Sequence, residues 1–344
     1  MNVLKRYGFL LFVFGCASFG WLRNNDFKKP KHFPKPVYDF DKNPIKSNKV
    51  ELGRLLFFDP ILSLDNTISC ASCHSPYNAF AHTDHKLSHG IGDSIGSRNA
   101  PALFNLAWQK SFMWDGAINH LDVQALAPLT DNKEMGEDLK NVIRKLSNKE
   151  MYVKAFKSAF GSDEITGEKL LLALSQFQLT LVSADSKYDR VKLGEEEFTR
   201  QEEKGYKIFQ NNCASCHAEP LFSNYELAKN SLPIDELLLD KGRRRVSGQK
   251  EDSMLFKVPS LRNLSFSYPY MHDGRFDKLS QVVKHYVDIG KLDIELDQRV
   301  QNIKKLNSNE QVDLISFLLC LNDKAFVFNP KHQFPKEILN QAKE

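Results

Sequence analysis

The sequence lacks any apolar run long enough to cross a bilayer as a helix, which takes roughly 20 apolar residues. It also lacks a basic block, and its 47 basic and 43 acidic side chains leave a net charge of only +4. We therefore expect no nucleic acid partner. Signals for β-strands are weak throughout, and the Gly-, Asn- and Pro-rich stretches are typical of long loops. A mainly α-helical protein is the expected fold class.

The N-terminus has the pattern of an export signal. Lys5-Arg6 precedes a short apolar run from Tyr7 to Gly15, so residues 1–16 are expected to be a secretory or lipoprotein signal for the periplasm. Cys16 follows that run as in a lipoprotein box, and both a membrane lipid anchor through Cys16 and ordinary cleavage nearby remain open. Residues 17–40 are rich in proline and lysine, which predicts an extended tether that is solvated or wraps the folded body.

Cysteine is scarce, and four of the six cysteines fall into two identical pentads. These are Cys70-Ala-Ser-Cys73-His74 and Cys213-Ala-Ser-Cys216-His217. The C-x-x-C-H spacing is the attachment signature of a c-type haem, in which two thiols bond to the porphyrin and the histidine binds the iron. Cys320 lies in a helical apolar pattern and is expected to be a buried core thiol.

Three other uses of the pentads are less favourable. Zinc ribbons place their Cys pairs about 15–20 residues apart, far closer than Cys70 and Cys213. A thioredoxin-type pair needs a βαβ setting, and a disulfide would not explain the repeated histidine. We therefore predict two covalently bound haem c groups, with His74 and His217 as proximal ligands.

The surroundings of the pentads repeat as well. A helix with Gly and Phe at matching places is expected before each pentad, over Glu51–Phe57 and Glu203–Phe209. An amphipathic helix is expected to close each half, over Glu168–Val182 and Asn309–Leu321. A capping box, Ser308-Asn-Glu-Gln311, is expected to open the last of these helices.

These repeats predict two cytochrome c-like helical domains, each with one covalently bound haem, joined by long loops. The first domain covers residues 41–190, and the second covers residues 191–335.

Six further segments match a known family in order and internal spacing. They are GSRNAPALFN (96–105), SFMWDG (111–116), QALAP (124–128), Glu134-Met135, FKVPSLRN (256–263) and YPYMHDGR (268–275). The set resembles the bacterial dihaem cytochrome c peroxidases, including MauG-like enzymes, over nearly all of the chain after about residue 40. The resemblance implies that hydrogen peroxide is reduced at the N-terminal haem. The C-terminal haem would then relay or store oxidising equivalents, with electrons from a small cytochrome c or another redox protein.

The resemblance assigns roles to three residues of the first half. Trp114 is implied to lie between the haems and carry electrons, while Gln124 and Glu134 match the glutamine and glutamate of the peroxide pocket. A carboxylate near an open iron can move the proton that peroxide must shift between its oxygens, and an amide can orient it. Without the resemblance, Trp114 would be a core residue and Glu134 an exposed acid.

The resemblance also implies a calcium ion between the two haem domains. An asparagine side chain and backbone carbonyl groups hold it in the family, at positions that correspond to Asn99, Ser267 and Pro269. Ligation by oxygen alone suits calcium.

The first departure from the family concerns the N-terminal iron. Where many members have a histidine that blocks this iron, the sequence has Ile91, which cannot bind iron. His89, His82 and His85 are nearby, and a rearranged loop could present one of them. The expected resting state has an open iron.

The second departure concerns the C-terminal iron. The usual methionine ligand lies fourteen residues after the histidine of the His-Asp-Gly motif, and here that place is Tyr286. MauG-like enzymes have tyrosine in this role, and a phenolate favours ferric iron where a thioether favours ferrous iron. Met254, Met271 and His285 are alternative ligands.

Two other functions and two properties stay open at this level. The chain could be a MauG-like oxidase of a protein or an organic molecule. It could also be a non-catalytic dihaem electron carrier with both irons closed. The oligomeric state, including a homodimer, is open, as is the lipid anchor.

Overall fold

The computed structural model describes residues 27–288, 297–301, 303 and 305–336. The predicted signal, Cys16 and the first part of the predicted tether therefore lie outside the described residues. Helices dominate, as expected, and the one small sheet pairs β1 (Leu227–Ala228) antiparallel with β2 (Phe256–Lys257). Among the described residues, no helix combines the length and apolar character that crossing a bilayer requires.

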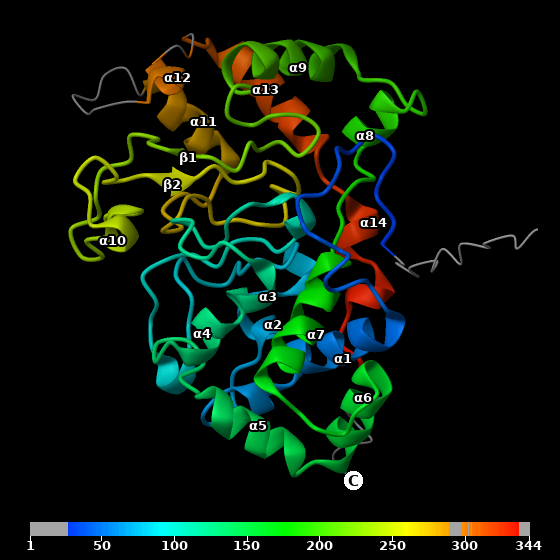
Figure 1. Cartoon of the computed structure of the whole chain (residues 1–344). Coiled ribbons are helices and arrows are strands. Elements are labelled where there is room, and N and C mark those ends of the chain that lie inside the picture. The colour runs from blue at the N-terminus through cyan, green and yellow to red at the C-terminus, as the bar shows by residue number, and fades with distance from the viewer. Residues whose placement is uncertain (1–26, 289–296, 302, 304, 337–344) are drawn as a thin grey trace, which may run out of the picture.

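The helices gather at two ends of the molecule, with loops and the small sheet between them (Figure 1). One end is built from α1 (Ser47–Phe58), α2 (Cys70–Cys73), α3 (Leu121–Gln124), α4 (Leu126–Thr130), α5 (Leu139–Ser147), α6 (Glu150–Phe160) and α7 (Gly167–Leu179). The other end follows α8 (Lys187–Lys192) and has α9 (Arg200–Asn212), α11 (Leu279–Asp288), α12 (Gln298–Gln301) and α13 (Ser308–Leu319), while α10 (Arg244–Ser247) lies beside the loops and the small sheet. The short α14 (Lys324–Val327) comes last.

Each end has its own apolar core around one crossing pair of helices, α1 with α7 and α9 with α13. A glycine permits each close approach. A Cβ atom on Gly53 of α1 would lie 1.9 Å from the carbonyl oxygen of Ala173 on α7. A Cβ atom on Gly205 of α9 would lie 1.9 Å from the carbonyl oxygen of Asp313 on α13. The four predicted helices and the packing role of these glycines are confirmed.

The start of α13 differs from the prediction by one residue. Asn307, not Ser308, is the N-cap, and its side chain accepts hydrogen bonds from the backbone N–H groups of Asn309 and Glu310. Glu310 closes the capping box by accepting from the backbone N–H of Asn307. Asparagine caps as well as serine does, so the pattern allowed both starts and the predicted box was wrong.

The described part of the N-terminal segment wraps the body instead of extending into solvent. Phe33 is only 3% exposed, and Phe27 stacks on Phe40 at 4.2 Å between ring centroids. The indole N–H of Trp108 donates to the carbonyl oxygen of Pro34 at 2.9 Å. Residues 27–40 therefore form a strap over the first core. Of the two arrangements expected for this segment, a solvated tether and one that wraps the folded body, its described part has the second.

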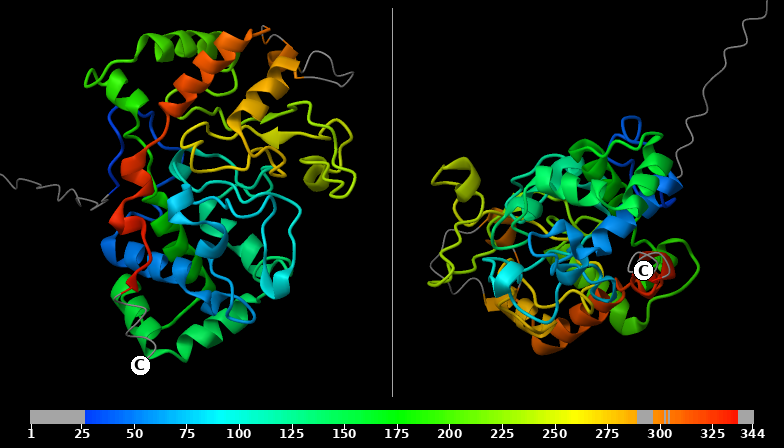
Figure 2. Two further views of the ribbon diagram at one scale, coloured as in Figure 1. Left: turned by 180° about the vertical axis from the view of Figure 1, so that it is seen from behind. Right: turned by 90° about the horizontal axis from the view of Figure 1, so that it is seen from below.

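The chain after α13 returns to the first core. Figure 2 shows this segment running from the end that holds α13 towards the opposite end. Phe326 and Val327 of α14 are buried in the first core, and Arg54 of α1 donates to the carbonyl oxygen of Gln333 at 2.9 Å. The last residues assigned by sequence to the second half thus pack against the first.

Candidate active site

The first pentad lies on α2 and ends at His74. The Nδ1 atom of His74 is 2.8 Å from the carbonyl oxygen of Phe80, so this nitrogen carries the proton and Nε2 is left with a free lone pair. Burial lowers the pKa of His74 to about 4, which keeps the imidazole neutral. A neutral ring whose other nitrogen donates to a carbonyl group is the form in which histidine binds a metal.

The second pentad follows α9 and repeats this arrangement. Nδ1 of His217 is 3.2 Å from the carbonyl oxygen of Phe222 and 3.1 Å from that of Pro259. Burial lowers the pKa of His217 to about 4 as well. The described cysteines are all free thiols, and burial raises the pKa of Cys70 and Cys213 to about 12.

One cavity of about 1180 Å³ is shared by the two pentads and is lined by Cys73, His74, Cys213, Cys216 and His217. Free thiols beside neutral histidines, all at one large cavity, fit covalent attachment of two haem groups. The pentads would hold these groups, with His74 and His217 as iron ligands. A haem supplies an iron that exchanges electrons with bound oxygen compounds.

Glu134 and Gln124 both line this cavity, as the resemblance implied. Burial, with a smaller contribution from the charge of Asp131, raises the pKa of Glu134 to about 7. A carboxyl group with this pKa can accept and return a proton at neutral pH. The amide of Gln124 donates to the sulfur of Met113 at 3.6 Å, not to Glu134. The expected direct orientation of Glu134 by Gln124 is therefore not observed.

The loop around Ile91 is bound to the turn that carries Glu134. The backbone N–H of Ile91 donates to the carbonyl oxygen of Glu134 at 2.8 Å. A Cβ atom on Gly90 would lie 2.4 Å from the same oxygen. The side chain of Ile91 reaches over Gly136, where a Cβ atom would meet its Cδ1 at 2.3 Å. The loop is thereby tied to the turn that carries Glu134.

The three histidines near Ile91 form a separate group. The rings of His85 and His89 stack at 4.2 Å, and His82 contacts His85 edge-on at 5.5 Å. Among the described residues that line the cavity, none of these histidines occurs.

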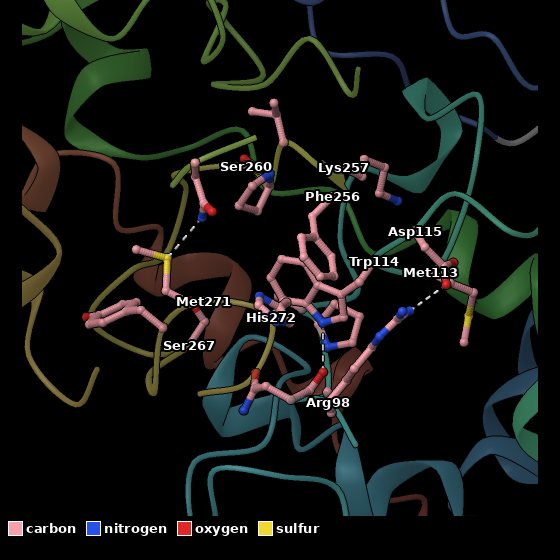
Figure 3. Close-up of a pocket in the computed structure, with 18 of the residues that line it drawn as sticks. Arg98, Met113, Trp114, Asp115, Phe256, Lys257, Ser260, Ser267, Met271 and His272 are labelled. Carbon is pink, nitrogen blue, oxygen red and sulfur yellow. Dashed lines mark hydrogen bonds and ion pairs between the residues drawn. The ribbon is translucent and has the colours of Figure 1, made fainter. Parts of the chain in front are cut away.

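Trp114 lies in the loops between the two pentads. Its indole N–H donates to the carbonyl oxygen of Asn99 at 2.8 Å, and its own carbonyl oxygen accepts from the N–H of Lys257 at 2.7 Å. Figure 3 shows its ring beside Phe256 and His272 at the centre of the cavity. Trp114 therefore lines the cavity and is hydrogen-bonded to residues of both halves.

The three residues implied for calcium line the same cavity. Asn99 is buried, and its side-chain amide donates to the carbonyl oxygen of Lys86 at 3.0 Å. The hydroxyl of Ser267 donates to the carbonyl oxygen of Asn263, and Pro269 follows Tyr268 through a cis peptide bond. The chain thus brings Asn99 together with two residues far along the sequence.

Tyr286 lies on α11 and lines the cavity beside the second pentad. Burial, and next to it the charge of Cys213, raises the pKa of Tyr286 above its usual value. His285 turns to the carbonyl oxygen of Asn230, 2.8 Å from its Nε2, and is absent from the described cavity lining. Met254 is absent from that lining too, whereas Met271 lines the cavity and accepts a hydrogen bond from Asn230. Of the four candidate ligands, Tyr286 and Met271 are therefore the ones that line the cavity.

Sequence reasoning missed the charged group around Arg98. Its guanidinium binds Asp240 at 2.6 Å and Asp115 at 2.7 Å, joining the loops of the two halves. It also missed Lys257 and His272, which line the cavity within two of the matched segments.

A sequence repeat that points to these positions was present, because the segments at 100–106 and 258–264 share the spacing x-P-x-L-x-N-L. Those at 113–116 and 271–274 share M-x-D-G. Aligned on these repeats, Trp114 corresponds to His272 and Asn99 to Lys257.

Paired pentads, neutral histidines and a shared cavity define this chain as a dihaem redox protein. The family model for di-haem cytochrome c peroxidase matches residues 47–197. The methylamine utilization protein MauG of Methylophilus methylotrophus is 34% identical over 319 residues, covering 90% of this chain and 92% of that protein. Cytochrome c551 peroxidase of Nitrosomonas europaea is 34% identical over 284 residues, covering 81% of each chain. The crystal structure of a MauG-like protein associated with microbial copper homeostasis matches with a TM-score of 0.81 at 28% identity, covering 90% of this chain and 99% of that one.

The chain belongs to the di-haem cytochrome c peroxidase and MauG family. It is a peroxidase-type oxidoreductase, and its family uses two haem groups, peroxide as substrate and cytochromes as electron donors. The resemblance found in the sequence is confirmed.

Proposed function

We propose that this chain is a MauG-like peroxidase that reduces hydrogen peroxide to water at the site of His74. Two electrons and two protons convert one peroxide molecule into two water molecules. Glu134 carries the proposal, because its carboxyl group reaches the same cavity as His74 with a pKa of about 7. It takes the proton from one peroxide oxygen and returns it to the other, which then leaves as water.

The loop at Ile91 keeps the peroxide side of this site accessible. In other family members the corresponding segment carries the blocking histidine. Here the hydrogen bond from Ile91 to Glu134 and the packing of Ile91 over Gly136 hold that segment against the Glu134 turn. No loop rearrangement is then needed before peroxide enters. This supports a site that is open in the resting enzyme.

The second half supplies the place where an oxidising equivalent is kept. Tyr286 would bind the iron held by His217 as a phenolate, and Trp114 would pass electrons between the two sites. An anionic ligand favours the oxidised metal, so this half stores oxidising charge instead of accepting electrons readily from a reduced cytochrome. Such a site suits either a redox protein or an organic molecule as the final electron source.

The proposal also includes a calcium site between the halves and export of the protein to the periplasm. Asn99, Ser267 and Pro269 supply oxygen atoms for a calcium ion between the halves, a chemistry that suits this metal. Export to the periplasm, with or without a lipid on Cys16, rests on the N-terminal pattern alone.

Spectroscopy of the purified ferric protein tests the proposal. One five-coordinate high-spin haem beside one low-spin haem is the expected result, with fast reaction at the high-spin site on adding peroxide. Two low-spin haems that do not react with peroxide would make the chain an electron carrier and end the proposal.

A further inference from the structure

Lys257 of β2 is attached to the segment that carries Trp114 at three points. Its backbone N–H donates to the carbonyl oxygen of Trp114 at 2.7 Å. Its ammonium group donates to Oε1 of Gln109 at 2.7 Å and to the carbonyl oxygen of Ser111 at 2.8 Å. These contacts hold the amine at one place in the cavity wall, close to Trp114 (Figure 3).

The charge of this amine has no partner of opposite sign. Both of its acceptors are neutral oxygens, and in the described part of the chain no carboxylate forms an ion pair with it. Asp115 is the acid whose charge acts on it, but that carboxylate is bound by Arg98 at 2.7 Å. Burial lowers the pKa of Lys257 to about 7, the direction expected for a cation that lacks a counter-ion.

His272, in the same cavity, has a ring nitrogen without a hydrogen-bond partner among the described residues. The residue is only 4% exposed, and this nitrogen is Nδ1. Its ring stacks on Phe256, the neighbour of Lys257, with centroids 3.8 Å apart. Buried polar groups are normally satisfied, so the unpaired Nδ1 of His272 and the unbalanced charge of Lys257 at one cavity indicate a polar group that is not part of the chain.

We propose that Lys257 binds a carboxylate, namely a propionate side chain of a haem held in this cavity. A haem brings its own carboxylates to the cavity, and an ammonium group with two of its three N–H bonds used has one left for such a group. The ion pair supplies the missing counter-charge. Because the same lysine is hydrogen-bonded to the segment that carries Trp114, Lys257 would also fix the position of that haem relative to the tryptophan. This inference rests on the haem binding in the proposed function.

Reduction potentials of the two haems, measured by spectroelectrochemistry on the haem-loaded protein, test the inference. Lys257→Met removes the charge at similar length, Lys257→Gln removes it but keeps N–H donors, and Lys257→Arg keeps it. Lys110→Met deletes an exposed lysine close by, and Gln109→Leu removes one hydrogen bond without changing charge.

We expect both neutral variants to lower the potential of one haem, because the added electron loses a nearby positive charge. The expected size is on the order of three- to ten-fold in the reduction equilibrium constant, typical of one partly screened charge. Lys257→Arg, Lys110→Met and Gln109→Leu should stay near the wild type. Loss of haem from the neutral variants but not from Lys257→Arg also supports the inference. Loss from Lys257→Arg as well would make the residue a packing element and overturn it.

Two more outcomes would overturn it. Potentials unchanged in the neutral variants at full haem content would show that no haem carboxylate meets Lys257. A charge effect that appears only with added acetate or formate would assign the site to a free carboxylate. Peroxide turnover, measured in parallel, reports on the proposed function separately, since the potentials can be read whether or not the protein turns over peroxide.

Discussion

The two ends of the molecule use the same scaffold and complete their iron sites differently. In both, a glycine lets two helices cross closely, and Nδ1 of the pentad histidine pairs with a phenylalanine carbonyl group. Phe80 and Phe222, which supply these carbonyl groups, both have positive φ angles. The two pentad histidines are therefore oriented by the same kind of backbone contact.

The opposite side differs because one helix continues and its counterpart stops. Counted from the Asp-Gly pair of each half, Tyr286 corresponds to Pro128. In the second half α11 runs unbroken to Asp288, but in the first half α3 ends at Gln124 and Pro128 lies in the separate α4. Proline has no atom that can bind iron. The two halves thus differ at corresponding positions after the repeat, as the proposed open first site and closed second site require.

Removing the proton carrier of the open site should have the largest effect. Glu134→Gln keeps the size of the side chain but cannot accept a proton, so peroxide turnover should fall about 10²–10⁴-fold. Stopped-flow kinetics with peroxide measures this at equal haem content. Glu150→Gln, an exposed acid on α6, is the control and should behave as the wild type. Unchanged turnover in Glu134→Gln would show that Glu134 is not the proton carrier. The proposed difference between the two halves would then lose this residue as a cause.

Removing the proposed ligand Tyr286 should make the second site resemble the proposed open site of the first half. Tyr286→Phe deletes the phenolate, so the low-spin signal of one haem should be lost or altered in the ferric spectrum. Tyr225→Phe is a matched control, because Tyr225 is a second tyrosine that lines the cavity and its hydroxyl has no hydrogen-bond partner in the described structure. A spectrum that changes in neither variant would favour Met271 as the ligand.

Blocking the shared helix crossings tests whether the two scaffolds are equivalent. Gly53→Ala and Gly205→Ala each place a methyl group on a backbone oxygen of the facing helix. Each should lower the free energy of unfolding by about 1–3 kcal/mol, the usual effect of overpacking. Thermal unfolding followed by circular dichroism measures this, with the exposed Lys204→Ala on α9 as the control. Destabilisation by only one of the two substitutions would show that one helix crossing accommodates an added methyl group better than the other.

The smallest expected effect is a change in pH dependence. Peroxide turnover should rise as pH increases through about 7, because only deprotonated Glu134 can accept the proton. The charge of Asp131 contributes to this raised pKa, so Asp131→Asn should shift the rise to lower pH. A rate profile against pH measures the shift, and Asp138→Asn, an exposed acid at the N-cap of α5, is the control. A profile that does not move would leave burial alone as the cause.

Local patterns were enough to predict the pentads and the helices beside them, whereas Glu134, Gln124 and Trp114 were assigned only through the resemblance of matched segments to a known family. The pentads and these helices depend on a fixed spacing or on a repeated segment. Contacts between distant segments were not predictable in the same way. The strap at 27–40 has a solvated composition, yet Phe33 is buried because a hydrophobic surface far along the chain receives it. Gln124 bonds to Met113 instead of orienting Glu134, which depends on side-chain directions that spacing does not specify.

The sequence by itself determined the haem-binding pentads, the twofold repeat and the choice of Ile91 and Tyr286 at the two positions that distinguish the halves. Covalent attachment depends on thiols and an imidazole at neighbouring positions, and neighbouring positions are what a sequence specifies. Only the tertiary structure decided that both pentads share one cavity and that the Ile91 loop is tied to the Glu134 turn. It also decided that the half-buried Lys257 lies beside Trp114 with no counter-ion among the described residues. These features arise where loops from both ends meet, and their energies depend on burial and on partners that lie far apart in the chain.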